Sequence, residues 1–214
     1  MKRLLAIVLL YWCSLLNAEP FIEVAGGKSY FTQYKKDGAR WYQEAFPWSA
    51  NLDSSSWRIG YGDRLNDHWF WTVSWLEIGK NSVTSQAVGD EEYDPVGHKC
   101  LARCDKPDHL WVSGSGRGPE LAFRWQFQNV YLRSGAFLWI TKLHAHVEHS
   151  FGITEDFYQK TNVMIAPFLG AGFRYKLGKL EVFAEATYYY GLGSGGYPIA
   201  KAAVVPMVGL SIGF

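Results

Sequence analysis

The chain has few cysteines, little excess charge and, beyond its N-terminus, no long hydrophobic run. Among its 214 residues are 3 cysteines, and the formal net charge is +1 at pH 7. So small a net charge gives no general attraction to polyanions, and we expect no nucleic-acid partner. From residue 19 onward no uninterrupted run of 18 apolar residues occurs. That absence excludes a transmembrane helix from this part of the sequence.

The N-terminus has the three parts of a secretory signal peptide. The first three residues are MKR, residues 4–16 form an apolar run, and Asn17-Ala18 precedes Glu19-Pro20. The run is shorter than the roughly 20 residues that a transmembrane helix needs. We therefore predict a signal peptide over residues 1–18 and a single domain over residues 19–214. Loss of the two basic residues in MKR changes the formal charge from +1 to −1.

Two cysteines remain after the predicted cleavage, because Cys13 lies within the signal peptide. Cys100 and Cys104 are separated by three residues. An even number of cysteines in a secreted chain predicts a disulfide between them. The alternative is a metal site, for which His98 and His109 are close enough in sequence to contribute ligands.

In contrast to charged residues, aromatic residues and glycines are abundant in the chain. The chain contains 10 Trp, 13 Tyr and 22 Gly, and 48% of its residues are hydrophobic while 19% are charged. Aromatic excess without helical spans is typical of transmembrane β-barrels, whose outer surface has Trp and Tyr girdles at both membrane interfaces while the interior is polar.

The C-terminal segment shows strict period-2 alternation. One face is apolar and the other is small or mild, as expected for a strand with lipid on one side and a crowded interior on the other. The apolar face carries Val204, Pro206, Val208, Leu210, Ile212 and Phe214, and the other face carries Val205, Met207, Gly209, Ser211 and Gly213.

Similar alternation recurs along the chain and gives eight strands. They are expected at about 21–31, 57–62, 69–76, 120–127, 130–143, 162–176, 180–190 and 204–214. Short links near 65, 128 and 178 alternate with long connections at about 32–55, 79–117, 144–161 and 191–201. This arrangement predicts an all-β, eight-stranded antiparallel transmembrane β-barrel with short periplasmic turns and long extracellular loops. A soluble β-sandwich or lipocalin-like barrel is the alternative. It is less favoured because the charged residues share the crowded face while Trp, Leu and Val share the other.

The end of the chain also carries a targeting motif. Residues 208–214 alternate apolar residues and end in Phe214, and residues 57–62, Trp-Arg-Ile-Gly-Tyr-Gly, precede an Asn-Asp turn. In these patterns the chain resembles the small eight-stranded outer-membrane barrels of the OmpA-like and opacity-like kind. The resemblance covers residues 19–214 and implies a location in the bacterial outer membrane. It also implies that Phe214 is the insertion signal read by the barrel-assembly machinery.

Seven charged residues are expected to face the barrel interior. An eight-stranded barrel is only wide enough for side chains to fill it, so these charges should pair with one another. One interpretation is a packed polar plug that holds the barrel closed, and the other is a gate in which rearranged pairs let ions or water through. The seven are Arg58, Glu120, Arg124, Arg133, Arg174, Glu181 and Glu185.

A histidine-rich cluster follows the fifth expected strand. It comprises His144, His146, Glu148, His149 and Ser150. Some eight-stranded barrels are lipid A deacylases that use His and Ser two residues apart on one strand. Here His149 and Ser150 are adjacent, so an extended chain would direct them to opposite faces. We assign no catalytic residues and expect rim histidines, with a metal or pH-sensitive patch as the alternative.

Taken as a sequence, the chain has the features of an outer-membrane anchor rather than an enzyme. No calcium-loop spacing occurs in the acidic 79–117 segment, and we expect no metal or cofactor. The expected role is structural and surface-interacting, through extracellular loops that contact lipopolysaccharide, a host component or another surface ligand. A narrow channel for ions or small solutes is the alternative, and a lipid A-modifying hydrolase is a further one.

Overall fold

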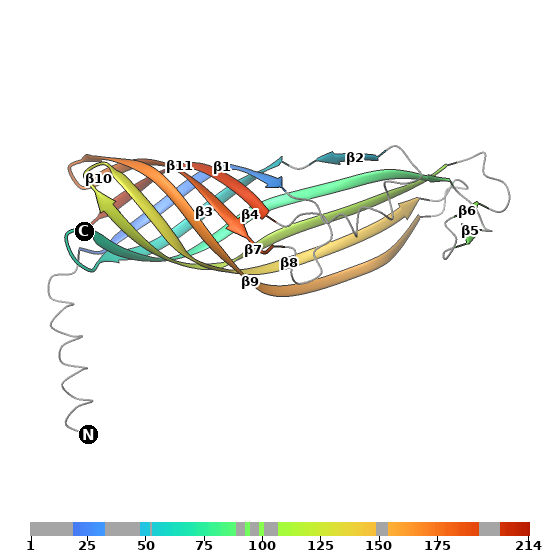
Figure 1. Ribbon diagram of the computed structural model, residues 1–214, viewed down its shortest axis with the longest axis horizontal. Coiled ribbons are helices and arrows are strands. Elements are labelled where there is room, and N and C mark those ends of the chain that lie inside the picture. The colour runs from blue at the N-terminus through green and yellow to red at the C-terminus, as the bar shows by residue number, and fades with distance from the viewer. Residues whose placement is uncertain are drawn as a thin grey trace, which may run out of the picture.

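A computed structural model describes residues 19–32, 48–51, 53–88, 93–94, 99–100, 107–148, 154–192 and 202–214. Eight of its strands close into an antiparallel barrel (Figure 1), in the order β4-β3-β1-β11-β10-β9-β8-β7 with β4 pairing back to β7. The strands are β1 (Phe21–Thr32), β3 (Asp53–Arg64), β4 (Trp69–Val88), β7 (Pro107–Phe127), β8 (Val130–Glu148), β9 (Thr154–Leu177), β10 (Leu180–Tyr190) and β11 (Ala202–Gly213). The closed eight-stranded barrel expected from the sequence is confirmed. No helix in these ranges is long and apolar enough to cross a membrane.

Three short turns join neighbouring strands at one end of the barrel. Residues 65–68 link β3 to β4, residues 128–129 link β7 to β8, and residues 178–179 link β9 to β10. Gln128 and Gly178 have positive φ angles of 53° and 69°, the left-handed backbone that tight hairpin turns require. In the first turn the Asn66 side-chain oxygen accepts hydrogen bonds from the backbone N–H groups of His68 and Trp69. These turns match the three short links predicted from the sequence.

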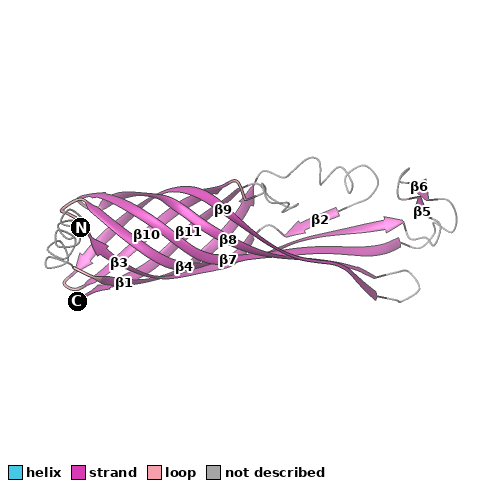
Figure 2. Cartoon of the chain, turned by 90° about the horizontal axis from the view of Figure 1, so that it is seen from below, coloured by secondary structure: helices cyan, strands magenta, loops and turns pink. Residues whose placement is uncertain are grey.

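Four neighbouring strands are much longer than the other four. β4, β7, β8 and β9 have 20, 21, 19 and 24 residues, whereas β1, β3, β10 and β11 have 11 or 12. Their ladders continue beyond the barrel, with Gly79–Val88 paired to Pro107–Gly116 and β8 paired to β9 as far as Glu148 and Thr154. Figure 2 shows these strands projecting as a sheet from the end opposite the turns. A short strand, β2 (Trp48–Asn51), extends this sheet by pairing with β4.

Three of the expected long loops are therefore wrong in extent, since the 32–55 segment contains β2 and the start of β3. Most of 79–117 is strand, and within it β5 (Tyr93–Asp94) pairs with β6 (Lys99–Cys100). Strand also covers residues 144–148 and 154–161 of the segment expected as a loop. Residues 80–86, Lys-Asn-Ser-Val-Thr-Ser-Gln, contain no alternation of apolar and polar side chains. The period-2 rule detects strands with one buried apolar face, so it gives no signal for a ladder of this composition.

Side chains alternate between the interior and the outer surface as the sequence predicted. In β10, Phe183, Glu185 and Thr187 are buried while Ala184 and Ala186 are exposed. The same alternation holds in β1, β3 and β11. Large apolar side chains exposed on the outside include Ile59, Val73, Leu121, Phe123, Ile165, Leu169, Val208 and Leu210. The strands thus have an apolar face outside, while the inner face mixes charged, polar and aromatic side chains; an apolar outer surface is typical of a transmembrane barrel rather than a soluble one.

Candidate functional site in the barrel interior

The seven charged residues predicted to face inward all lie on the inner wall. Glu181 is partly exposed near the turns, and the other six are buried. They come from five strands, because Arg58 lies on β3, Glu120 and Arg124 on β7, Arg133 on β8, Arg174 on β9, and Glu181 and Glu185 on β10. The closed barrel brings these strands around one axis, so the side chains meet although their positions span more than a hundred residues.

Glu185 is the centre of one part of this charge network. Its Oε1 accepts hydrogen bonds from Arg58 Nη1 at 2.5 Å and Arg133 Nη1 at 2.6 Å. Its Oε2 accepts a hydrogen bond from the Tyr131 hydroxyl at 2.7 Å. The carboxylate therefore offsets two buried guanidinium groups and satisfies a buried phenol, which an isolated buried charge could not do.

Glu120 forms the second centre and is linked to the first through shared arginines. It accepts hydrogen bonds from the Tyr189 hydroxyl at 2.5 Å and the Ser74 hydroxyl at 3.0 Å. Arg133 donates to Glu120 as well as to Glu185. Arg58 also lies near both carboxylates, with its Nη1 3.9 Å from Glu120 Oε1. Charge-assisted bonds that share partners in this way form one connected network across the barrel.

Glu23 is a member of the network that the sequence-based set omitted. Its carboxylate lies 3.2 Å from Arg58 Nη2, 3.1 Å from Arg174 Nη2 and 3.7 Å from Arg124 Nη1. The signal was present, since alternation in the first strand puts Glu23 on the same inner face as Phe21 and Ala25. With Glu23 included, four arginines face four glutamates in the interior.

An apolar layer fills the interior on the side away from the turns. The rings of Phe137 and Trp139 stack at 6.3 Å, and Phe31 stacks on Trp139 at 6.4 Å. Phe137 also contacts Tyr189 edge-on at 5.6 Å, which joins this layer to the charge network. A Cβ added at Gly116 would overlap the Trp139 indole, so the absence of a side chain there makes room for the ring. Paired charges and packed rings together make the interior a plug.

The outer surface has the features of a lipid-facing wall. Near the turns, Tyr61 packs on Trp71 at 6.0 Å and Trp125 stacks on Phe127 at 6.3 Å, forming part of an aromatic girdle. Toward the protruding sheet, Lys80, Ser115 and Lys142 are cross-strand neighbours that point outward. Aromatic residues at one border of an apolar band and basic residues at the other fit the two interfaces of a bilayer.

The remaining sequence-predicted sites are placed only in part. β8 continues through His144, His146 and Glu148, so these residues belong to a strand of the protruding sheet rather than to a loop. The His144 and His146 rings stack at 6.3 Å. His149, Ser150 and Cys104 lie outside the described residues, and the Cys100–Cys104 disulfide remains a prediction. In the described part of the chain, no group of three or more His, Cys, Asp or Glu could hold a metal ion. Phe214 ends the chain beside Pro20, whose carbonyl accepts its N–H at 3.1 Å.

The fold and its surfaces define the class of the protein as an eight-stranded transmembrane-type β-barrel with a packed interior. No protein-family model matches the sequence, and no curated protein matches it either. Among solved structures, Neisserial surface protein A aligns with 92% of this chain and 99% of its own at 13% identity and a TM-score of 0.41. Ail, the attachment invasion locus protein of Yersinia pestis, aligns at 12% identity with 92% and 97% coverage and a TM-score of 0.39. The N-terminal β-barrel domain of Pseudomonas aeruginosa OprF aligns at 15% identity with 92% and 98% coverage and a TM-score of 0.38.

Proposed function

We propose that the chain is a bacterial outer-membrane protein whose barrel anchors a protruding β-sheet, and that this sheet is a surface for interaction with other molecules. The observation that carries the proposal is the continuation of β4, β7, β8 and β9 beyond the barrel as a hydrogen-bonded sheet. In the orientation usual for bacterial outer-membrane barrels the short turns face the periplasm, so the sheet faces the outside of the cell. Hydrogen bonding along four strands makes the sheet a more rigid platform than separate loops of the same length.

The edge of the sheet offers a specific way to bind a partner. Among the described residues, Thr154–Ala166 of β9 pair with β8 alone. A strand edge that no other strand covers presents backbone N–H and C=O groups that an extended peptide can bind by adding a strand. The partner that this edge fits best is therefore a protein or peptide with an exposed extended segment.

Basic residues at the border of the apolar band nearest the protruding sheet are suited to contact with lipopolysaccharide. Lys80, Arg117 and Lys142 are exposed and point outward within two residues of one another along neighbouring strands. Basic side chains at this level of an outer-membrane barrel can pair with phosphate groups of the outer leaflet. This belt would fix the depth of the barrel and hold the sheet clear of the lipid surface.

The packed interior supports an anchor rather than a channel. Trp139 and Phe137 are fully buried across the apolar layer, and the arginines below them are held by glutamates. An open pore would need water along this path. We expect the wild-type barrel to show no steady conductance in planar bilayers, whereas stable single-channel currents would favour the channel.

The interaction surface is tested by trimming the sheet. In one variant, residues 81–114 and 143–160 are each replaced by a short glycine-containing turn, so that the barrel keeps its interior network. The folded wild-type protein is used to select from a phage-displayed library of random peptides, and the selected peptides are then measured on both forms. We expect binding to the wild type and none to the trimmed barrel. Failure to select peptides, or equal binding to both forms, would contradict the proposal, and wild-type heat resistance of the trimmed barrel on gels controls for folding.

A further inference from the structure

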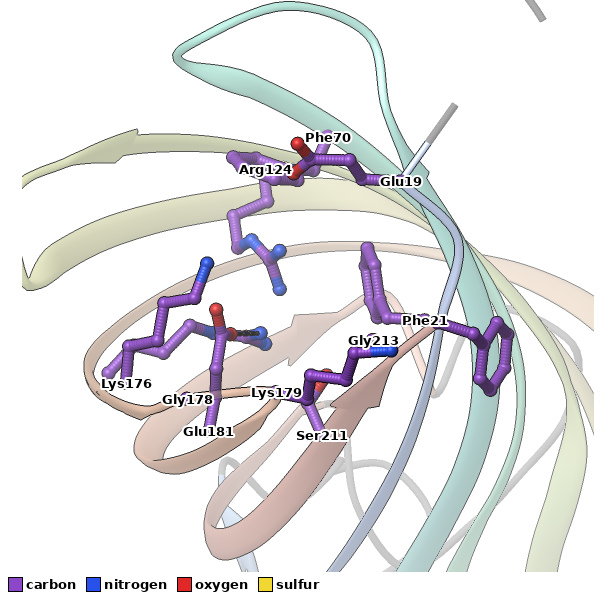
Figure 3. A pocket seen from close by; sticks show the side chains of 12 residues that line it. Glu19, Phe21, Phe70, Arg124, Lys176, Gly178, Lys179, Glu181, Ser211 and Gly213 are labelled. Atoms are coloured by element: carbon purple, nitrogen blue, oxygen red, sulfur yellow. Dashed lines mark hydrogen bonds and ion pairs between the residues drawn. The ribbon is translucent and has the colours of Figure 1, made fainter. Parts of the chain in front are cut away.

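A basic cavity opens at the turn end of the barrel, far from the protruding sheet. Its volume is about 400 Å³, within the size range of small-ligand sites. Figure 3 shows the side chains of β1, β7, β9 and β10 that surround it. Its charged lining residues are Arg124, Arg174, Lys176 and Lys179, with Glu19 and Glu181 as the acidic members.

Arg124 is a buried cation whose one ion-pair partner among the described residues, Glu23, is distant. It is 5% exposed, yet within the described part of the chain its guanidinium makes no hydrogen bond, and the Glu23 carboxylate is 3.7 Å from Nη1. Phe70 and Phe21 stack against it at 4.5 and 5.1 Å. Stacking occupies the faces of the guanidinium and leaves its in-plane N–H donors available. These donors point toward the cavity in Figure 3.

The acidic residues around the cavity are already engaged with other cations. Glu181 Oε2 lies 2.5 Å from Arg174 Nη1, and Glu19 Oε2 lies 3.0 Å from Arg64 Nη1. Glu23 Oε2 is shared between Arg174 and the more distant Arg124. The cavity therefore has surplus positive charge.

That surplus comes from Lys176 and Lys179, because Arg124 and Arg174 are offset by Glu23 and Glu181. Lys176 and Lys179 have no ion pair with any described residue, and with Arg124 they approach the cavity from three sides in Figure 3.

We propose that this cavity binds a phosphate group. Inorganic phosphate or a phosphomonoester presents three or more free oxygens and up to two negative charges, so it can accept from a guanidinium fork and from two ammonium groups at once. A lipid phosphodiester has one charge and two free oxygens, and it can accept from the guanidinium fork and from one ammonium group. The phosphate can come from a free phosphate or soluble phosphomonoester, or from the headgroup of a phospholipid in the inner leaflet of the membrane.

Phosphate binding is tested on the full barrel folded in a phosphate-free maltoside detergent. Inorganic phosphate is titrated at constant ionic strength while calorimetry and the NMR signals of the Gly178 and Gly213 amides, which line the cavity, are recorded. We expect saturable one-site binding with shifts at both amides. The double variant Lys176→Gln/Lys179→Gln should weaken it by at least about tenfold, since it loses two charged donors. The control Lys28→Gln changes an exposed lysine outside the cavity and should bind like the wild type.

A second arm separates the two sources of phosphate. The barrel is placed in nanodiscs of phosphatidylcholine with or without phosphatidylglycerol, and the same amides are followed. Shifts that depend on phosphatidylglycerol and are abolished in Lys176→Gln/Lys179→Gln assign the site to a lipid headgroup, whereas shifts with inorganic phosphate alone assign it to a soluble ligand. Absence of saturable binding to either probe, or equal weakening by Lys28→Gln, would overturn the proposal. Arg124→Lys, which keeps the charge but loses the fork, should bind more weakly than the wild type.

Discussion

At the scale of single residues, the interior contains buried charged groups that would destabilise the barrel if they had no partner. Glu185 contacts Arg58 of β3 and both Arg133 and Tyr131 of β8, so one carboxylate stabilises three polar side chains from two other strands. Buried ion pairs add little stability over a well-packed apolar core, but removal of one partner leaves the other charge buried without a counterion. We therefore expect the network to favour one register of the strands, because a shifted strand would separate the ion-pair partners.

Removal of the Glu185 carboxylate should weaken the barrel strongly. We expect Glu185→Leu to lower the free energy of unfolding by about 3–5 kcal/mol, because two buried arginines lose their nearest acceptor. Asp53→Asn is the control, because its ion pair with Lys28 is exposed on both sides and its loss should cost about 0–1 kcal/mol. Urea unfolding in lipid vesicles measures both. Equal losses for the two variants would show that the inner charges do not hold the barrel together.

A glycine pair tests the packing of the apolar layer. Gly116→Ala places a methyl group against the Trp139 indole and should cost about 1–3 kcal/mol through overpacking. Gly26→Ala, where a Cβ would meet nothing within 4 Å, should change stability by no more than about 0.5 kcal/mol. The comparison uses the same unfolding assay. If Gly116→Ala is as stable as Gly26→Ala, the ring layer is looser than described.

At the scale of strands, alternation was the signal that could be predicted from sequence, and it worked where one face is buried. β10 and β11 have the expected register because a one-residue slip would place Glu181 and Glu185 in lipid. The same rule stopped near residue 76 of β4, although the strand continues to Val88. Beyond that point the ladder is maintained by backbone pairing to β7, a long-range contact that leaves no local pattern.

The register of β10 can be tested from its outer face. Ala184 is exposed between the buried Phe183 and Glu185, so Ala184→Arg would place a charge in lipid and reduce stability by about 2–4 kcal/mol near the midplane. Thr161→Arg, at the level of Lys142 near the border of the apolar band, should cost only about 0–1 kcal/mol. Folding yields and unfolding in vesicles report the difference. Tolerance of Ala184→Arg equal to that of Thr161→Arg would mean that β10 does not face lipid.

At the scale of the whole molecule, we propose that the charge-filled barrel anchors the protein and that the protruding sheet contacts other molecules. Seven of the inner charges were identified from single strands because each strand carries its own alternation. Their individual partners could not be predicted, because the pairing of arginines with glutamates depends on closure of the barrel and on the stagger of its strands. The surroundings of Arg124 likewise form only when Phe21 and Glu23 of β1 and Phe70 of β4 come together around it.

The central claim is that the apolar outer face of the barrel lies in lipid, and spin-label accessibility tests it most directly. Single nitroxide labels are placed at the outward positions Val182, Ala184 and Ala186 and at Asp67 in a turn, in protein reconstituted into bilayers. The account predicts high collision rates with oxygen and low rates with an aqueous nickel relaxant at the three β10 positions, and the reverse at Asp67. Ready access of the aqueous relaxant to all three β10 positions in the folded protein would contradict it.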